Sequence, residues 1–215
     1  MKKNKKILIS GTGGFSKEVL CIIIDLGLIE RFAGFIEPDS IIKNGEIPLK
    51  LLGYPVFPYS FVKSEEHIVS LAIGDSKIRE KILSQLPSNL EYISLIHPSV
   101  IVSKWVEIGR GAIVCAGSIL TCDIKIGDFV QINLNTTIGH DCKIGDFFTT
   151  APNVNLSGNC FFGNHIYCGT SSSVKQGISI CDNVVIGMGA VVTKNINESG
   201  IYVGIPASKI KINNI

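Results

Sequence analysis

An aliphatic residue recurs at every sixth position through the second half of this chain. Of the 17 positions spaced in this way from Ile96 to Val192, 14 carry Ile, Leu or Val, although these residue types account for only 66 of the 215 residues. A helix repeats about every 3.6 residues and a strand about every two, so a period of six fits neither. It is typical of short strands wound into a three-sided prism, with three hexads in each 18-residue coil.

The three exceptions to the aliphatic rule, Thr150, Phe162 and Cys168, change no spacing, so the register is unbroken over nearly six coils. The residue four places after each aliphatic position is small or apolar, which predicts two inward side chains per hexad. The residue directly after the aliphatic one is Gly in seven hexads, and we expect these glycines to provide the backbone freedom of tight corners. They are Gly109, Gly127, Gly139, Gly145, Gly163, Gly169 and Gly187.

Two cysteines provide a test of this register. Cys142 and Cys160 lie 18 residues apart, so we expect them to stack inside the prism on adjacent coils, about 4.8 Å apart along the strand-pairing direction. The chain has seven cysteines and no C-x-x-C motif, which favours reduced thiols over a disulfide framework or a zinc site. We expect the pair to stabilise the coil and to have no part in catalysis.

Residues 6 to about 90 follow a different pattern, in which short apolar strands alternate with helical stretches. This alternation predicts an α/β domain with a small Rossmann-like parallel sheet that binds ligands at the carboxyl ends of its strands. We place this domain at residues 1–93 and the β-helix at residues 94–215. The expected strands are 6–10, 32–36 and 67–73, and the expected helices are 16–27 and 76–86.

The turn after the first expected strand contains Gly11, Gly13 and Gly14. Backbone N–H groups in such a turn, together with the N-terminus of the next helix, can bind a phosphate. The dinucleotide pattern G-x-G-x-x-G needs Gly where Ser16 stands, and a domain of about 90 residues cannot supply both mononucleotide-binding halves. The sequence therefore favours a single nucleotide diphosphate over NAD, and the alternative is a tight turn without a ligand.

Three segments, in this order, resemble one enzyme family. They are residues 11–18 (GTGGFSKE), 71–79 (LAIGDSKIR) and 132–146 (INLNTTIGHDCKIGD). They are similar to segments of the bacterial acyltransferases that N-acetylate nucleotide-linked 4-amino sugars, the PglD/NeuD group. Residues 202–207 (YVGIPA) resemble the CoA-contacting C-terminal loop of that family. The resemblance implies a left-handed parallel β-helix, a homotrimer, acetyl-CoA as cosubstrate and a nucleotide-linked amino sugar as acceptor.

The resemblance assigns the chemistry to His140, Asp141 and Asn133. His140 matches the family's general base, Asp141 its orienting carboxylate, and Asn133 a polar site of the motif. An amine must lose a proton as it attacks a thioester, and imidazole titrates near neutral pH, where a general base is most effective. From the residues alone, His140 differs from the other three histidines because it follows a Gly corner and has an acidic neighbour.

Acetyl-CoA and the nucleotide sugar have separate expected contacts. The resemblance implies that the N–H of Gly158, 18 residues after His140, faces the thioester carbonyl as an oxyanion donor. Thr149 stands where relatives can have a His that binds the acetyl carbonyl, and Gly204, Pro206 and Ala207 belong to the C-terminal loop. The expected nucleotide-sugar contacts are Gly11, Gly13, Gly14, Phe15, Glu37, Asp39, Gly74 and Arg79, and no metal site is expected.

Composition argues against several other functions. Lys and Arg total 20 against 18 Asp and Glu, and the one basic cluster lies at residues 2–6, so nucleic-acid binding is not expected. The longest apolar run, residues 19–29, contains Asp25 and is too short to span a membrane. Because no signal peptide is recognisable, we expect a cytoplasmic protein without membrane insertion.

The leading hypothesis is an acetyl-CoA-dependent N-acetyltransferase of a UDP- or dTDP-linked 4-amino-4,6-dideoxy sugar in surface glycan synthesis. Two alternatives remain open. O-acetylation of a sialic-acid-like sugar needs the same base but no sugar amine. A non-catalytic trimer that only binds a nucleotide sugar needs no base, and the His140–Asp141 pair argues against it.

Overall fold

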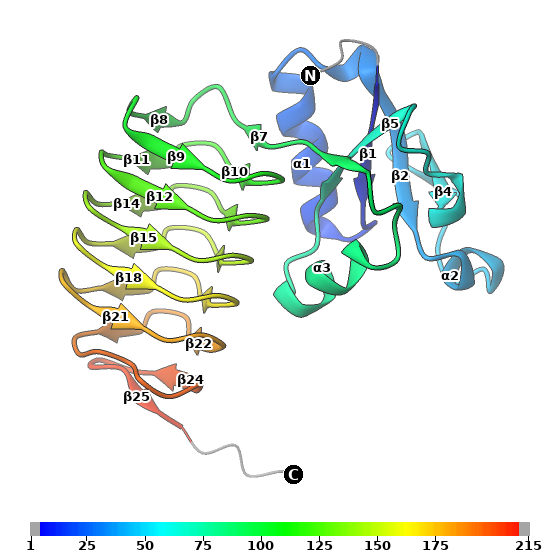
Figure 1. Ribbon diagram of the computed structural model, residues 1–215. Coiled ribbons are helices and arrows are strands. Elements are labelled where there is room, and N and C mark those ends of the chain that lie inside the picture. Colours follow the sequence, from blue (N-terminus) through cyan, green and yellow to red (C-terminus); the bar gives the residue numbers. More distant parts are fainter. Residues whose placement is uncertain (1–4, 211–215) are drawn as a thin grey trace. The chain divides into compact units, whose positions relative to one another are not determined.

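The computed structural model describes residues 5–210. Contacts divide the chain after Pro98 into two compact units, five residues beyond the boundary expected at residue 93. The first unit is an α/β domain and the second is a parallel β-helix (Figure 1). Both units have the architecture that the sequence predicts.

The α/β unit contains one sheet of six strands in the order β3-β4-β2-β1-β5-β6. Its central strands are buried on both faces, as continuous apolar runs in parallel sheets are; Ile7, Leu8 and Ile9 of β1 are fully buried. The elements are β1 (Lys6–Ser10), α1 (Gly14–Asp25), β2 (Phe32–Glu37), α2 (Asp39–Lys43), β3 (Lys50–Leu51), β4 (Tyr54–Pro58), β5 (His67–Leu71), α3 (Ser76–Leu83), β6 (Glu91–Tyr92) and β7 (Leu95–Ile96), with 3-10 turns at Ile29–Arg31 and Tyr59–Phe61.

Strand β1 lies between β2 and β5 and pairs in parallel with both. The chain therefore leaves β1 toward one side of the sheet to form β2 and later returns to the other side to form β5. In parallel sheets, such a reversal of direction opens a crevice at the carboxyl ends of the strands, where ligands bind. The loops after β1, β2 and β5 lie at this end of the sheet.

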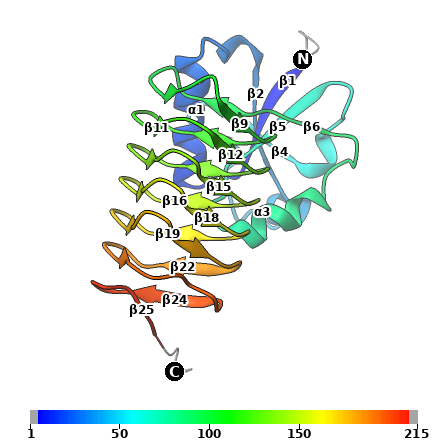
Figure 2. The ribbon, with the colours of Figure 1, turned by 60° about the vertical axis from the view of Figure 1, so that its left-hand side comes forward.

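The β-helix unit consists of three sheets, one for each side of the prism, and Figure 2 shows the coils stacked along its axis. The first sheet contains β8 (Ile101–Val102), β11 (Ile119–Leu120), β14 (Thr137–Ile138), β17 (Asn155–Leu156), β20 (Ser173–Val174) and β23 (Val191–Val192). The second contains β9 (Val106–Ile108), β12 (Ile124–Ile126), β15 (Lys143–Ile144), β18 (Phe161–Phe162) and β21 (Ser179–Ile180). The third includes β10 (Ile113–Val114), β13 (Gln131–Ile132), β16 (Thr149–Thr150), β19 (Tyr167–Cys168), β22 (Val184–Ile186) and β24 (Gly200–Val203).

The 18-residue coil predicted from the hexads is confirmed. Lys125 pairs with Lys143 and Lys143 with Phe161, so successive coils keep one register. The aliphatic positions point inward, and Leu120 and Ile138 are fully buried. Coils stacked in this way are consistent with the left-handed β-helix that the family resemblance implies.

The corners of the prism are formed differently from the sequence expectation. None of the seven glycines that follow an aliphatic residue has a positive φ. The left-handed residue of a corner lies three places after the aliphatic position, whether or not a glycine follows that position. It is Asn or Asp at several corners, for example Asn135 and Asp141 with φ of 55° and 61°, and these residue types tolerate this conformation. The seven glycines are required because adjacent coils approach closely there: a Cβ on Gly139 would lie 2.5 Å from the N of Gly158.

The regular winding ends after β23. Ile186 of β22 pairs with Tyr202 of β24, a step of 16 residues in place of 18. The chain then reverses, and β25 (Ser208–Lys209) pairs with β24 in the antiparallel direction. Between them lie Gly204, with φ of 95°, and the cis peptide bond of Ile205 and Pro206.

Candidate active site

His140 and Asp141 occupy one corner of the prism, between β14 and β15. The Nδ1 atom of His140 lies 2.5 Å from Oδ2 of Asp141, and both side chains are 52% exposed. The carbonyl of His140 accepts the N–H of Asn159 from the next coil at 2.7 Å, which fixes the backbone at this corner. Asp141 is itself the left-handed corner residue, so one residue both turns the chain and presents a carboxylate to the histidine.

This pair has the arrangement of a general base and its orienting group. With a proton on Nδ1 donated to Asp141, the Nε2 atom carries a lone pair and can accept a proton. An exposed ion pair contributes only about 0–1 kcal/mol to stability, so the main effect of Asp141 is to fix the tautomer and direction of the ring. Among residues 5–210, no atom hydrogen-bonds Nε2.

Gly158 lies next to His140 on the following coil. A Cβ on Gly158 would come 2.6 Å from Nε2 of His140, so any side chain at this position would displace the ring. The carbonyl of Gly158 accepts the N–H of Gly177 at 3.1 Å. The N–H of Gly158, in contrast, donates to no atom of the described chain. The structure therefore brings a free backbone donor and a free imidazole nitrogen to the same corner.

Asn133 and Thr149 make other contacts. Asn133 lies at the preceding corner, where its Oδ1 accepts the N–H of Leu134 at 2.7 Å. Its own N–H donates to the hydroxyl of Thr150 at 2.9 Å. Thr149 is 5% exposed, on the third sheet. Neither side chain hydrogen-bonds the His140–Asp141 pair.

The C-terminal loop residues Gly204, Pro206 and Ala207 form the turn between β24 and β25. The N–H of Val191 donates to the carbonyl of Gly204 at 3.1 Å, and the N–H of Ala207 donates back to the carbonyl of Val191 at 2.8 Å. These two bonds fix the turn to the last regular coil. Ile205 at its tip is 77% exposed.

The glycine loop lies at the carboxyl end of β1, as predicted. Gly11 has φ of 108°, and its N–H donates to the carbonyl of Ile36 at 3.0 Å. Gly13 is the N-cap of α1 and Gly14 its first residue, with no side-chain cap, and no atom lies within 4 Å of a Cβ built on either. The side-chain positions of Gly13 and Gly14 therefore face open space at the start of α1, beside the half-buried Phe15.

The loop after β2 brings Glu37, but not Asp39, to the glycine loop. The hydroxyl of Thr12 donates to Oε1 of Glu37 at 2.7 Å. Asp39 begins α2, and its Oδ2 accepts the N–H of Ser60 at 3.1 Å. The hydrogen bonds from Ser60 lower the pKa of Asp39. The two acids thus face different neighbours.

Arg79 supports the loop after β5 from within the protein. Its side chain is fully buried, and Nη1 donates to the carbonyls of Ile73 at 2.7 Å and Gly74 at 3.2 Å. Burial lowers the pKa of Arg79, and the two carbonyl acceptors stabilise its charged form. The sequence expectation of a substrate contact therefore needs correction: Arg79 shapes the loop at Gly74, and only the loop is exposed.

Sequence reasoning missed two side chains near the carboxyl end of β1, Thr12 and Tyr59. The hydroxyl of Tyr59 lies 3.0 Å from that of Ser10, the last residue of β1, and both side chains are buried. Burial raises the pKa of Tyr59 to about 12. No local pattern indicates this contact, because Ser10 and Tyr59 are 49 residues apart.

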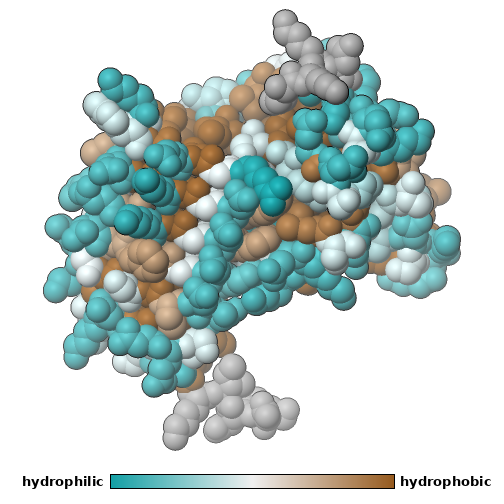
Figure 3. Space-filling model, viewed as in Figure 1, coloured by the Kyte–Doolittle hydropathy of each residue, from teal (hydrophilic) through white to brown (hydrophobic). Residues whose placement is uncertain are grey.

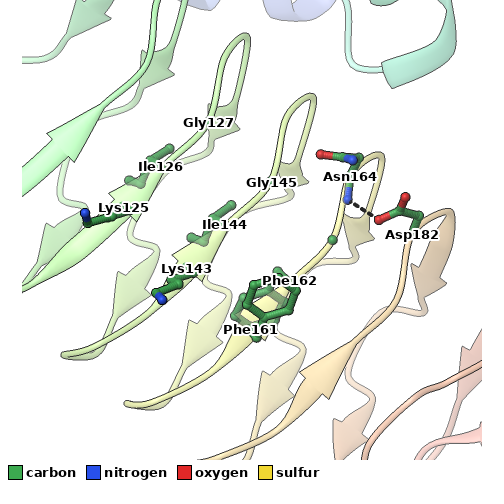
Figure 4. A pocket seen from close by; sticks show the side chains of 11 residues that line it. Lys125, Ile126, Gly127, Lys143, Ile144, Gly145, Phe161, Phe162, Asn164 and Asp182 are labelled. Carbon is green, nitrogen blue, oxygen red and sulfur yellow. Dashed lines mark hydrogen bonds between the residues drawn. The ribbon is translucent and has the colours of Figure 1, made fainter.

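A shallow hollow of about 360 Å³ lies elsewhere, on the outer face of β12, β15 and β18 (Figure 4). Lys125, Lys143 and Phe161 line it from three successive strands. At its other end the N–H of Asn164 donates to Oδ1 of Asp182 at 2.7 Å. On the face of the β-helix in Figure 3, hydrophobic and hydrophilic residues lie in adjoining columns. None of the predicted site residues lines this hollow.

Within residues 5–210, no group of three or more His, Cys, Asp or Glu side chains is placed to hold a metal ion. No helix in the same range has both the length and the apolar character needed to cross a bilayer.

Comparisons with known proteins agree with this fold. Residues 6–86 match the model of the PglD N-terminal domain, and residues 100–122 and 158–194 match that of the hexapeptide repeat of succinyl-transferase. The structure of WeeI from Acinetobacter baumannii is 33% identical, with a TM-score of 0.86, and the match covers 96% of this chain and all of WeeI. This chain belongs to the PglD/NeuD-like group of hexapeptide-repeat sugar N-acetyltransferases.

Two further members of this group have been solved with ligands. A His-to-Asn mutant of perosamine N-acetyltransferase from Caulobacter crescentus, in complex with CoA and GDP-perosamine, is 27% identical. The match covers 94% of this chain and 95% of that one, with a TM-score of 0.85. The acetyltransferase domain of PglB from Neisseria gonorrhoeae, in complex with acetyl coenzyme A, is also 27% identical, with 96% and 100% covered and a TM-score of 0.85. The similarity to these structures confirms the predicted fold and the predicted class of enzyme, a sugar N-acetyltransferase.

Proposed function

We propose that this protein transfers the acetyl group of acetyl-CoA to the amine of a nucleotide-linked 4-amino-4,6-dideoxy sugar, with His140 as general base. The observation that carries the proposal is the corner where the His140–Asp141 pair meets the free N–H of Gly158. The relatives that hold CoA or acetyl coenzyme A, and in one case GDP-perosamine, support the choice of ligands.

The proposed reaction is one direct displacement. The amine nitrogen attacks the thioester carbon while Nε2 of His140 accepts a proton from it, and the N–C bond forms as the carbonyl oxygen becomes an oxyanion. The N–H of Gly158 donates to that oxyanion. The C–S bond then breaks, and the imidazolium returns its proton to the leaving thiolate, giving the amide and free CoA thiol. Asp141 stabilises the imidazolium between these steps.

The nucleotide-sugar site is proposed at the crevice of the α/β unit. Gly13 and Gly14 are exposed at the N-terminus of α1, which suits a diphosphate, and Glu37, oriented by Thr12, can accept hydrogen bonds from a base or ribose. Arg79 holds the neighbouring loop in place. These contacts fit UDP, dTDP and GDP equally.

We also propose a homotrimer in which the first sheet of the β-helix packs against a second copy. The outward residues of this sheet, Thr137, Asn155, Ser173 and Val191 among them, carry no charge. The corner beside it presents exposed apolar side chains, Leu134 at 37% and Met188 at 79%. Interface cores are depleted in charge, and His140 lies at the other border of this sheet. A threefold assembly would therefore form a groove for acetyl-CoA at His140.

The test is thiol release from acetyl-CoA with a panel of UDP-, dTDP- and GDP-linked amino sugars, each matched with its hydroxyl analogue. Release only with amines supports N-acetylation. Release with the hydroxyl analogue alone would identify an O-acetyltransferase. Tight binding of a nucleotide sugar without any release would instead favour the non-catalytic alternative.

A further inference from the structure

The Cys142 thiol hydrogen-bonds a single peptide group at the candidate active site. Its Sγ donates to the carbonyl oxygen of Ser157 at 3.3 Å. Ser157 C=O and Gly158 N–H belong to one planar trans peptide, so they point in opposite directions. Cys142 is an inward, fully buried residue. Because its thiol draws the carbonyl toward the interior of the prism, the N–H of Gly158 points outward.

We propose that Cys142 is a positioning residue that directs the N–H of Gly158 toward the thioester carbonyl oxygen. This inference rests on the proposed acetyl transfer. It also revises the sequence expectation that the stacked cysteines have no part in catalysis.

Nothing else in the described chain fixes the orientation of this peptide through a hydrogen bond. The N–H of Ser157 donates to Val174 and the carbonyl of Gly158 accepts from Gly177, but these groups belong to the flanking peptides. Gly158 has no Cβ to restrict rotation about its own bonds. Loss of the thiol donor would therefore leave the peptide free to turn, and the oxyanion donor would turn with it.

The thiol is in the right protonation state to donate. The neighbouring Cys160 thiol and burial both raise the pKa of Cys142, so it keeps its proton. The same contact recurs along the prism: Cys160 donates to the carbonyl of Lys175 at 3.3 Å, and Ser118 donates to that of Asn133 at 3.0 Å. In each case an inward side chain donates to the carbonyl of the residue 15 places later. For Cys142 that carbonyl belongs to Ser157, and the same peptide carries the N–H of Gly158 beside His140.

The experiment compares Cys142→Ala, Cys142→Ser and the control Cys168→Ala. Cys168 is equally buried and lies inside the same prism, and its thiol makes no hydrogen bond within residues 5–210. We expect Cys142→Ala to lower kcat about tenfold, less than the roughly 10²–10³-fold lost when an oxyanion donor is removed outright, with both KM values nearly unchanged. The hydroxyl of Cys142→Ser should restore most of kcat. Cys168→Ala should lower the Tm as much as Cys142→Ala and leave kcat unchanged.

Equal kcat values for Cys142→Ala and Cys168→Ala would overturn the inference, as would a failure of Cys142→Ser to restore kcat. A crystal structure of Cys142→Ala gives a second measurement that does not depend on turnover. An unmoved Ser157–Gly158 peptide in it would also reject the positioning role. Failure of the proposed function is a separate result, namely no thiol release by the wild-type protein with any amino sugar.

Discussion

Gly158 lies directly against the imidazole of His140, and a Cβ added to it would come 2.6 Å from Nε2 and 2.7 Å from Cε1. Two residues on adjacent coils thus form one site, and a side chain added at Gly158 would move the imidazole of His140. The contact depends on the 18-residue register, because 18 residues separate His140 from Gly158.

Gly158→Ala should displace the histidine ring and inactivate the enzyme while the protein stays folded. We expect a loss of kcat/KM of roughly 10²-fold, the scale of a general-base contribution. Gly163→Ala is the matched control. Its Cβ would also crowd the next coil, but there it would meet Asp182 and not His140. It should lower the Tm and keep kcat. Comparable kcat losses in both variants would show that crowding between coils, and not the position of His140, causes the effect.

His140→Ala should lower kcat/KM by at least about 10²-fold and leave the Tm unchanged, because the exposed side chain stabilises little. Asp141→Asn should cost less, since the base survives and Asn tolerates the left-handed backbone at this corner. Steady-state thiol release with circular dichroism melting checks both. Near-normal turnover of His140→Ala would exclude it as the base.

Glu37→Gln should raise the KM for the nucleotide sugar about tenfold and leave that for acetyl-CoA unchanged. The amide keeps an acceptor for Thr12 but loses the charge, and a hydrogen bond to a charged group contributes about 1.5–3 kcal/mol. Asp39→Asn is the control, because the Asp39 carboxylate accepts its hydrogen bond from Ser60. Steady-state kinetics with each substrate varied in turn distinguishes them; an equal rise in both KM values would contradict the assignment of Glu37.

Met188→Asp should dissociate the proposed trimer without unfolding the chain. The side chain is 79% exposed in the single chain, so the new charge is costly only where a second copy covers it. Sedimentation velocity at low protein concentration should show monomers, with activity lost in parallel. Lys125→Asp, on the second sheet, should remain trimeric. A fully active monomer of either variant would exclude a site shared between subunits.

Stability should fall below about pH 6.5 because of His67. Burial lowers the pKa of His67 from 6.5, and its Nδ1 accepts the N–H of Lys63 at 3.0 Å, which requires an unprotonated nitrogen. Below that pH the unfolded chain binds more protons than the folded one, so the free energy of unfolding decreases as pH falls. Urea unfolding from pH 7.5 to 5 should show a smaller decrease for His67→Asn. An identical pH dependence would reject the assignment.

The long-range order of the β-helix follows from sequence, because its contacts repeat at a fixed spacing. Counting in hexads predicts that Lys143 pairs with Lys125 and Phe161. The same count cannot tell why a glycine is needed at Gly139, since close approach of the next coil and a positive φ both select glycine. In the α/β unit, the β3–β4 hairpin has no sequence signal: β3 has two residues, and β4 contains two prolines.

The site was predictable only in part, for a similar reason. The family motif predicts His140 and Asp141, and the 18-residue coil then predicts that Gly158 lies beside His140. The contacts of Thr12 with Glu37 and of Ser10 with Tyr59 join loops 25 and 49 residues apart, with no repeat to relate them. Arg79 has the charge expected of a ligand contact, and only burial shows that it supports a loop.

The reversal of the chain at β25 also affects how copies of this protein can assemble. The last coil of a parallel β-helix presents open strand edges, on which a coil from another molecule could continue the winding into a fibre. Because β25 runs antiparallel to β24, the strand at that edge of the third sheet no longer has the direction that a following coil would need. At this edge of the third sheet, the hairpin therefore opposes the parallel addition of a coil from another molecule.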